Sequence, residues 1–212
     1  AALDKLMTQV VQCMRDAGLV EFDAHAQDGM RVRASAGAAS FHREATLTKS
    51  LEKAQAQVQV LEQAHAAETS DVSAREQAAQ ERAAHERVDR LTAARAELPA
   101  VRAVKPVEER GDARVSSTDP EARVMKMADG GFRPAYNWEF VVDTARLVIT
   151  GVEVINAGSD KSTRPLPMLA QDQQRCGRLP RNWLMDGGFV TLSAIEAAEV
   201  EQRVRVLAPV PE

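Results

Sequence analysis

Apolar residues near the start of the chain recur at intervals of three and four residues, which predicts an amphipathic helix over residues 3–19. The periodic positions are Leu3, Leu6, Met7, Val10, Val11 and Met14. Gly18 follows them and suits the C-terminal cap of a helix. We expect a separate N-terminal element of residues 1–19, which could be the last helix of an upstream domain or a start produced by processing.

The next segment, residues 20–36, alternates imperfectly between apolar and polar positions on both sides of Asp28-Gly29. Met30, Val32 and Ala34 fall on one face, and Arg31 and Arg33 fall on the other. Because alternation indicates β-structure and Asp-Gly is a favoured turn pair, we predict a strand, a break at Asp28 and a second strand.

Residues 44–98 contain no glycine, proline or aromatic residue and are rich in strong helix formers. One run with coiled-coil spacing extends from Leu47 to His65, and a second run, out of phase with the first, extends from Ala84 to Leu98. Between the runs, residues 69–73 offer a turn and an N-cap. The pattern predicts two antiparallel helices that form a hairpin inserted between strands.

The remainder of the chain predicts a linker followed by alternating strands and helices. Residues 99–131, rich in Pro, Gly, Asp and Arg and without a period, are interpreted as a linker or loop. The elements predicted after it are a β-hairpin of residues 137–143 and 147–155, a helix ending near Cys176, a strand at 182–186, a helix at 191–202 and a strand at 203–208. We assign Trp138, Phe140 and Trp183 to the core. This order predicts an α/β protein with a mixed sheet and flanking helices, interrupted by the long helical hairpin.

Charge and cysteine usage exclude several classes of protein. The formal net charge is −4, and most of it comes from residues 44–98, which contain ten acidic and seven basic residues. A net negative charge argues against a protein that coats DNA or an anionic membrane through its overall electrostatic field. Cys13 and Cys176 have no Cys or His at metal-ligand spacing, which argues against a disulfide framework and a structural zinc site. No apolar stretch reaches membrane-spanning length, and the start of the chain lacks a secretory signal pattern. We therefore expect a cytoplasmic protein with no membrane partner.

Two aspartates stand next to glycine at the ends of predicted strands, Asp28 before Gly29 and Asp186 before Gly187. Strand ends are where an open α/β sheet presents functional side chains. Asp-Gly is also a favoured turn pair, and it recurs at Asp129, where no strand is predicted before it. On spacing alone, turns explain these pairs better than a shared site.

Five phrases in consistent order resemble the DDE transposases of bacterial insertion sequences, in particular the subgroup with a helical insertion after the first acidic strand. They are DGMRVRASAG at 28–37, STDPEARVMK at 117–126, GGFRPAYN-EFVVDTA at 130–145, VEVINAGSD at 152–160 and WLMDGGF at 183–189. The likeness implies a ribonuclease-H-like catalytic core of residues 20–43 and 132–212, interrupted by the hairpin of residues 44–98. It implies DNA transposition by metal-dependent phosphoryl transfer.

The resemblance assigns the first catalytic aspartate to Asp28 and the second to Asp186, in a phrase that ends on the aromatic Phe189. Such a site uses two Mg²⁺ or Mn²⁺ ions to activate the attacking hydroxyl, stabilise the leaving alkoxide and neutralise phosphoryl charge. Asp28 would bridge the two ions and Asp186 would complete the shell of one, because these hard cations prefer oxygen ligands.

The third acid of the family, a glutamate on a helix after the last core strand, has no evident counterpart before the chain stops at Glu212. Glu196, Glu199 and Glu201 follow Asp186 closely, on the next predicted helix, and are interpreted as surface charges. Two of three ligands should hold metal poorly. We therefore expect a C-terminally truncated or inactive copy of a transposase, whose phosphoryl-transfer activity is impaired.

The resemblance also implies DNA as a partner, at transposon ends and target, and association with the nucleoid if the protein is active. Basic residues beside the acids would contact phosphates without reading sequence. The candidates are Arg31, Arg33, Lys161, Arg164 and Arg178. The last three belong to the segment 161–181, whose five basic residues, including Arg175 and Arg181, oppose only Asp172. Ordinary solubilising charge explains each of them singly just as well.

A second hypothesis needs no catalysis. The hairpin of residues 44–98 could pair with another copy of the chain, with a full-length transposase or with another coiled coil, while the sheet merely supports it. Mn²⁺ binding that depends on Asp28 and Asp186 separates the two hypotheses, because only the transposase hypothesis requires it.

Overall fold

The computed structural model describes residues 2–66, 73–156, 165–187 and 191–209. They fall into two compact units, which we name the sheet unit, within residues 1–32 and 136–212, and the hairpin unit, within residues 33–135. This division differs from the predicted domains, because residues 33–43 and 99–131 belong to the same unit as the helical hairpin.

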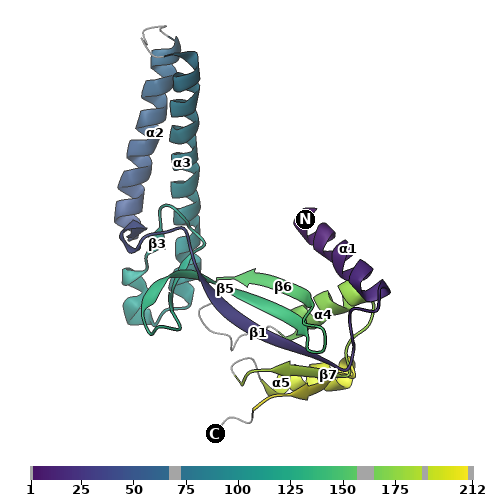
Figure 1. The fold of residues 1–212 in the computed structure, drawn as a ribbon. Helices are drawn as coiled ribbons and strands as arrows, with labels where there is room; N and C mark the ends of the chain where they lie inside the picture. The colour runs from purple at the N-terminus through teal and green to yellow at the C-terminus, as the bar shows by residue number, and fades with distance from the viewer. Residues whose placement is uncertain (1, 67–72, 157–164, 188–190, 210–212) are drawn as a thin grey trace. The chain divides into compact units, whose positions relative to one another are not determined.

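A mixed β-sheet makes up most of the sheet unit (Figure 1), whereas its strand β4 and the first four residues of β5, which pair with β4, belong to the hairpin unit. Its strands follow the order β4-β5-β1-β7-β8, and β6 also pairs with β5. The strands are β1 Ala24–Arg33, β4 Arg123–Lys126, β5 Phe132–Asp143, β6 Ile149–Ile155, β7 Asn182–Met185 and β8 Arg205–Leu207. β5 is antiparallel to β4 and β6, whereas β1, β7 and β8 are mutually parallel. The predicted mixed α/β class is therefore confirmed.

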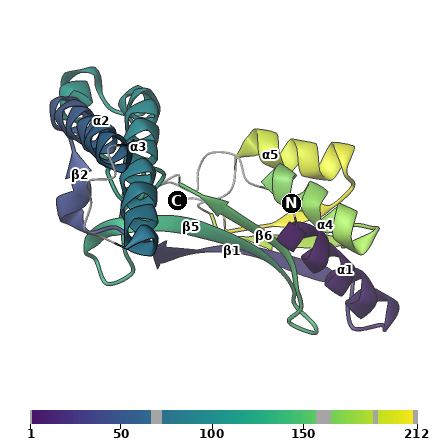
Figure 2. The same cartoon turned by 90° about the horizontal axis from the view of Figure 1, so that it is seen from above.

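Helices cover one face of this sheet. They are α4, Pro165–Cys176, and α5, Leu192–Glu196, which continues as a π-helical turn, Ala197–Glu201. Met168 and Leu169 of α4 and Ala198 of the π-helical turn pack with Val141, Trp183 and Met185 of the sheet. Figure 2 shows α4 and α5 on the same side of the strands. The core of the sheet unit therefore lies between this face and the helices.

The buried face of β5 is not the one that its apolar pattern predicted. Trp138 and Phe140 are only half-buried, whereas Glu139 and Asp143, on the alternate positions, are fully buried. The assignment of Trp138 and Phe140 to the core is therefore wrong, and that of Trp183, which is fully buried, is confirmed. Both faces of the sheet carry apolar residues, so the alternation could not say which face the helices would cover.

β1 is one continuous strand through Asp28-Gly29, and the predicted break is wrong. The twelve-residue strand β5 accompanies it, with main-chain hydrogen bonds from Thr144 to Ala24 at one end and from Ala34 to Pro134 at the other. These bonds make the two strands antiparallel. A long partner strand satisfies the backbone groups of β1, so the turn preference of Asp-Gly is overridden.

The N-terminal helix α1, Ala2–Asp16, forms as its periodicity predicted. It ends at Asp16, and Gly18, which follows, has a φ of 72°, in the left-handed region that glycine tolerates. Leu19 N donates to Met14 O at 2.9 Å and closes this cap. Val11 is the buried residue of α1 and packs with Val20 and Cys176.

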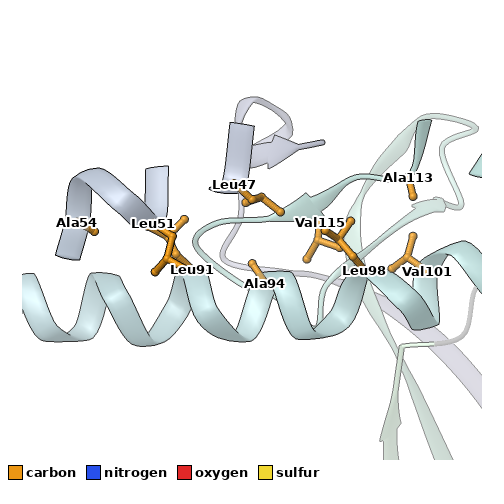
Figure 3. Close-up of a cluster of buried hydrophobic side chains, with 9 residues drawn as sticks. All are labelled: Leu47, Leu51, Ala54, Leu91, Ala94, Leu98, Val101, Ala113 and Val115. Carbon is orange, nitrogen blue, oxygen red and sulfur yellow. The ribbon is translucent and has the colours of Figure 1, made fainter. Parts of the chain in front are cut away.

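The hairpin unit contains the two predicted helices, α2, Glu44–Ala66, and α3, Ala74–Ala103. Ion pairs join Glu44 to Arg102 at 2.6 Å and His65 to Glu81 at 2.7 Å, as an antiparallel arrangement requires. Figure 3 shows the apolar core, which comprises Leu47, Leu51, Ala54, Leu91, Ala94, Leu98 and Val101, with Ala113 and Val115 added beside them. Ser73 caps α3 in a capping box with Glu76, whereas residues 69–72 of the predicted turn lie outside the described residues.

Residues 99–131 are not the irregular linker that their composition predicted. The helix α3 extends past Pro99, and a 3₁₀ helix, η2, follows at Val107–Asp112. The short strand β2, Phe41–His42, directly follows a 3₁₀ turn, η1, Ala38–Ser40. It pairs with the short strand β3, Val115–Ser116. Strands of two to four residues are too short to show a period in the sequence, which explains why they were missed.

Candidate active site

Asp28 lies on β1, and Asp186 directly follows the neighbouring parallel strand β7, so the two residues line one cavity. The β1–β7 register pairs Ala26 with Leu184 and Gln27 with Met185, so Asp28 and Asp186 occupy the next two facing positions. Neighbouring strands are separated by about 4.8 Å. Two acids that are remote in the chain are therefore neighbours in the fold.

The two side chains also point to the same face of the sheet. Gln27 and Met185 are buried on the face that the helices cover, and side chains alternate along a strand. Asp28 and Asp186 accordingly point to the opposite face, and both are exposed. The Asp28 carboxylate accepts a hydrogen bond from its neighbour Gly29 N at 2.7 Å.

The pair stands where the strand order of the sheet reverses. From β1 the chain builds β5 and β6 on one side, and it then returns to add β7 and β8 on the other side of β1. Open α/β sheets bind ligands outside the carboxyl ends of strands at such a reversal. Asp186 directly follows β7, whereas Asp28 lies in the middle of β1 and not at the strand end that its sequence predicted.

An open cavity of about 690 Å³ occupies this position, and both acids line it. Its other walls are mainly apolar and come from the middle of β1, from the ends of β7 and β8 and from Ala208 and Pro209. Both side chains offer carboxylate oxygens, the ligand type that hard divalent cations prefer. The cavity beside them is open to a large substrate.

No third ligand joins the pair among the described residues, where no group of three or more His, Cys, Asp or Glu side chains could hold a metal ion. Glu196, Glu199 and Glu201 are exposed, and a Glu199 carboxylate oxygen accepts a hydrogen bond from Val206 N at 3.1 Å. Their interpretation as surface charges agrees with these positions.

The basic residues proposed to contact DNA do not gather around the acids. Arg31 and Arg33 lie on β1 at odd-numbered positions, so alternation turns them to the face opposite Asp28. The Arg178 guanidinium stacks over the Phe22 ring at 3.8 Å, near the start of β1. That end is about 13 Å from Asp28 along the strand, four residues at about 3.3 Å each. Lys161 and Arg164 lie outside the described residues.

Arg175 and Asp172, counted in the sequence as parts of a basic surface segment, are both buried. One Arg175 nitrogen donates to Thr150 O at 3.0 Å, and the other pairs with Asp4 at 2.7 Å. Arg175 therefore joins α1, α4 and β6 and is not part of a DNA-binding surface.

A buried polar network lies on the helix-covered face directly behind Asp28. Trp183 Nε1 donates to Gln27 Oε1, and Gln27 Nε2 donates to Glu139 Oε2, both at 3.2 Å. These bonds hold the side chain of Gln27, the residue before Asp28, on the buried face. The alternate spacing of His25 and Gln27 on β1 was a signal in the sequence that a polar set shares this face.

His25 belongs to the same buried face. Its Nδ1 lies 3.0 Å from Asp172 Oδ2 and its Nε2 lies 2.8 Å from Glu21 O. Burial lowers the pKa of His25, but the hydrogen bond and charge of Asp172, the Glu21 carbonyl and the charge of Asp143 outweigh it, so the pKa lies above the ordinary value of 6.5. The Cys176 thiol donates to the same carboxylate at 3.6 Å.

No protein-family model and no curated protein sequence matches this chain. Within the part of the chain that the structure describes, no helix is both long enough and apolar enough to cross a membrane.

Proposed function

We propose that the sheet unit is a ribonuclease-H-like catalytic core and that the chain acts in DNA transposition through metal-dependent phosphoryl transfer, in a form that lacks the third carboxylate. The observation that carries the proposal is that Asp28 of β1 and Asp186, the residue after the parallel strand β7, line the same cavity. The sequence resemblance singles out the same two residues, and spacing alone would not have brought them together.

The donor set fits a hydrated divalent cation. Mg²⁺ keeps several waters and is commonly held through one or two carboxylates plus substrate phosphates, which matches two exposed aspartates at an open cavity. When bound, such a cation supplies charge stabilisation for the phosphoryl group and lowers the pKa of a bound water. Asp28 and Asp186 would hold it, while the neighbouring Gln27 is held on the buried face by its hydrogen bonds with Glu139 and Trp183.

Lys161 and Arg164 lie outside the described residues, so their assignment as phosphate contacts is based on the sequence resemblance. We retain these two as phosphate contacts and withdraw Arg178, because it stacks on Phe22 near the start of β1.

Mn²⁺ binding to the full chain, measured by electron paramagnetic resonance and calorimetry, tests this proposal. Asp28→Asn and Asp186→Asn should each weaken binding at least tenfold, whereas Asp129→Asn should leave it unchanged. Asp129 is the matched control, because it also precedes glycine but is paired with Arg133 at 2.6 Å. Binding that survives both substitutions, or that fails equally in the control, would refute the assignment.

The non-catalytic alternative remains a second candidate because α2 and α3 form a long hairpin whose apolar core is built within the chain. It expects no cation binding at Asp28 and Asp186 and concentration-dependent association through residues 44–98. A hairpin substitution on the exposed side, such as Val60→Glu, would then abolish association.

A further inference from the structure

The two helices of the hairpin unit enclose a small hollow, which lies outside the cavity of Asp28 and Asp186. It has a volume of about 220 Å³ and is lined by Lys53, Ala54 and Gln57 of α2 and by Ala84 and Arg87 of α3. Ala54 is a buried residue of the seam between the helices, in which larger side chains such as Leu51 and Leu91 pack elsewhere. Alanine on both helices therefore leaves room for a small ligand.

Three polar side chains line the hollow, and two of them are cations. Lys53 and Gln57 are four residues apart, so they lie on the same face of α2, and Arg87 belongs to the facing helix α3. The ammonium and guanidinium groups only donate hydrogen bonds, and the amide of Gln57 can donate two more. The described residues that line this hollow include no carboxylate. Its charge and its donors therefore suit an anion.

Lys53 and Arg87 also lack the acidic neighbours that most basic residues of the hairpin have. An acid stands three or four residues away, at the spacing of ion pairs within a helix, from Lys49, Arg75, Arg82 and Arg90. Arg95 has no such neighbour, but its charge acts on Glu44. Lys53 and Arg87 have no acid at that spacing and form no ion pair with any described residue. The two basic residues without an acidic partner are thus the two that line the hollow.

A phosphate group matches this set of donors better than a carboxylate does. A guanidinium binds two oxygens of a phosphate side by side, and an ammonium adds a compact point charge. A phosphate monoester carries a charge of about −1.5 to −2 at neutral pH, which balances two cations, whereas a carboxylate carries a single charge. The remaining phosphate oxygen can accept a hydrogen bond from the amide of Gln57.

We propose that the hollow formed by Lys53, Gln57 and Arg87 binds a dianionic phosphate group, supplied either by inorganic phosphate or by a phosphate monoester. The bound group would link α2 to α3 through its oxygens, so binding should also stabilise the hairpin against unfolding. This proposal concerns the hairpin unit alone. It is independent of the cation site and of the transposase assignment.

Calorimetric titration of the full chain at low ionic strength, with inorganic phosphate and separately with glycerol phosphate, tests the proposal. Lys53→Ala and Arg87→Ala should each raise the dissociation constant at least tenfold, because each removes a charge-assisted hydrogen bond. Alanine is a strong helix former, so both variants should keep the helix content that circular dichroism measures. Tighter binding of one ligand than of the other supports the proposal and identifies the source of the phosphate group.

Two matched controls locate the site. Lys49→Ala and Arg82→Ala remove the same types of charge from the same two helices, but neither residue lines the hollow, so both should leave the dissociation constant unchanged. A chain that binds neither phosphate ligand overturns the proposal. Binding that weakens equally in all four variants also overturns it, because the overall charge of the hairpin would then explain the affinity. Acetate that binds as tightly as phosphate overturns the assignment of a dianion.

Discussion

The buried pair of His25 and Asp172 provides a stringent test of how the sheet unit is held together. His25 is fully buried, its two ring nitrogens face the Asp172 carboxylate at 3.0 Å and the Glu21 carbonyl at 2.8 Å, and both partners accept hydrogen bonds. An imidazole that donates from both nitrogens is protonated. We therefore expect folding to stabilise the charged form of His25, in agreement with its raised pKa.

The sign of the pH dependence follows from this. Because the pKa of His25 in the folded chain lies above the ordinary value of 6.5, its stabilising contribution is complete below that value and is lost as pH rises through the folded pKa. The loss for one proton is at most about 1.4 kcal/mol per pH unit. Removal of one partner of a buried ion pair costs about 3–5 kcal/mol, because the other charge stays buried without its partner.

We predict that His25→Leu destabilises the chain by about 3–5 kcal/mol and removes the decrease in stability above pH 6.5. The double variant with Asp172→Leu should recover much of the loss, because no uncompensated charge remains. Urea unfolding followed by fluorescence of buried Trp183, repeated between about pH 6 and pH 9, measures both effects. A variant that keeps the wild-type pH slope, or a double variant no more stable than His25→Leu, would refute the reasoning.

Three further predictions follow from local packing. Gly151→Ala should destabilise the chain by about 1–3 kcal/mol in urea unfolding, because the added Cβ would lie 2.7 Å from a methyl group of Val141. The double variant with Val141→Ala should recover part of this loss. In the native chain a maleimide should label Cys13 but not Cys176, because burial and Asp172 raise the pKa of the Cys176 thiol to about 12. Mass spectrometry of digests should then show one labelled peptide, and rapid labelling at Cys176 would contradict its burial. Ser73→Ala should cost about 1 kcal/mol through loss of the α3 cap, whereas unchanged thermal stability would show that the cap contributes nothing measurable.

Local patterns in the sequence were sufficient wherever a long element carried its own period. The hairpin helices were predictable because their seams repeat over several turns, and Ser73 because a capping box is a local arrangement. The β5–β6 hairpin was predictable because a short connection joins two strongly apolar segments. Such features depend only on neighbours in the chain.

Features set by distant contacts were not predictable in this way. The strand β4 has four residues and is defined by its pairing with the start of β5. Glu139 is buried and Trp138 is half-buried because α4 and the π-helical turn cover the face of the sheet on which Glu139 lies. The hydrogen bond that Gln27 donates to Glu139 offsets the cost of burying this carboxylate. Apolar alternation marks two faces of a strand but cannot say which face another element will cover.

The candidate site divides between the two sources of information. The sequence by itself determined the residue types, aspartate followed by glycine after a strand, and the family resemblance that selects Asp28 and Asp186 from three such pairs. Only the tertiary structure decided that β7 pairs in parallel with β1 in the register that sets these carboxylates side by side. Register is a property of two strands and of the packing that covers them, so no local pattern in either strand could specify it.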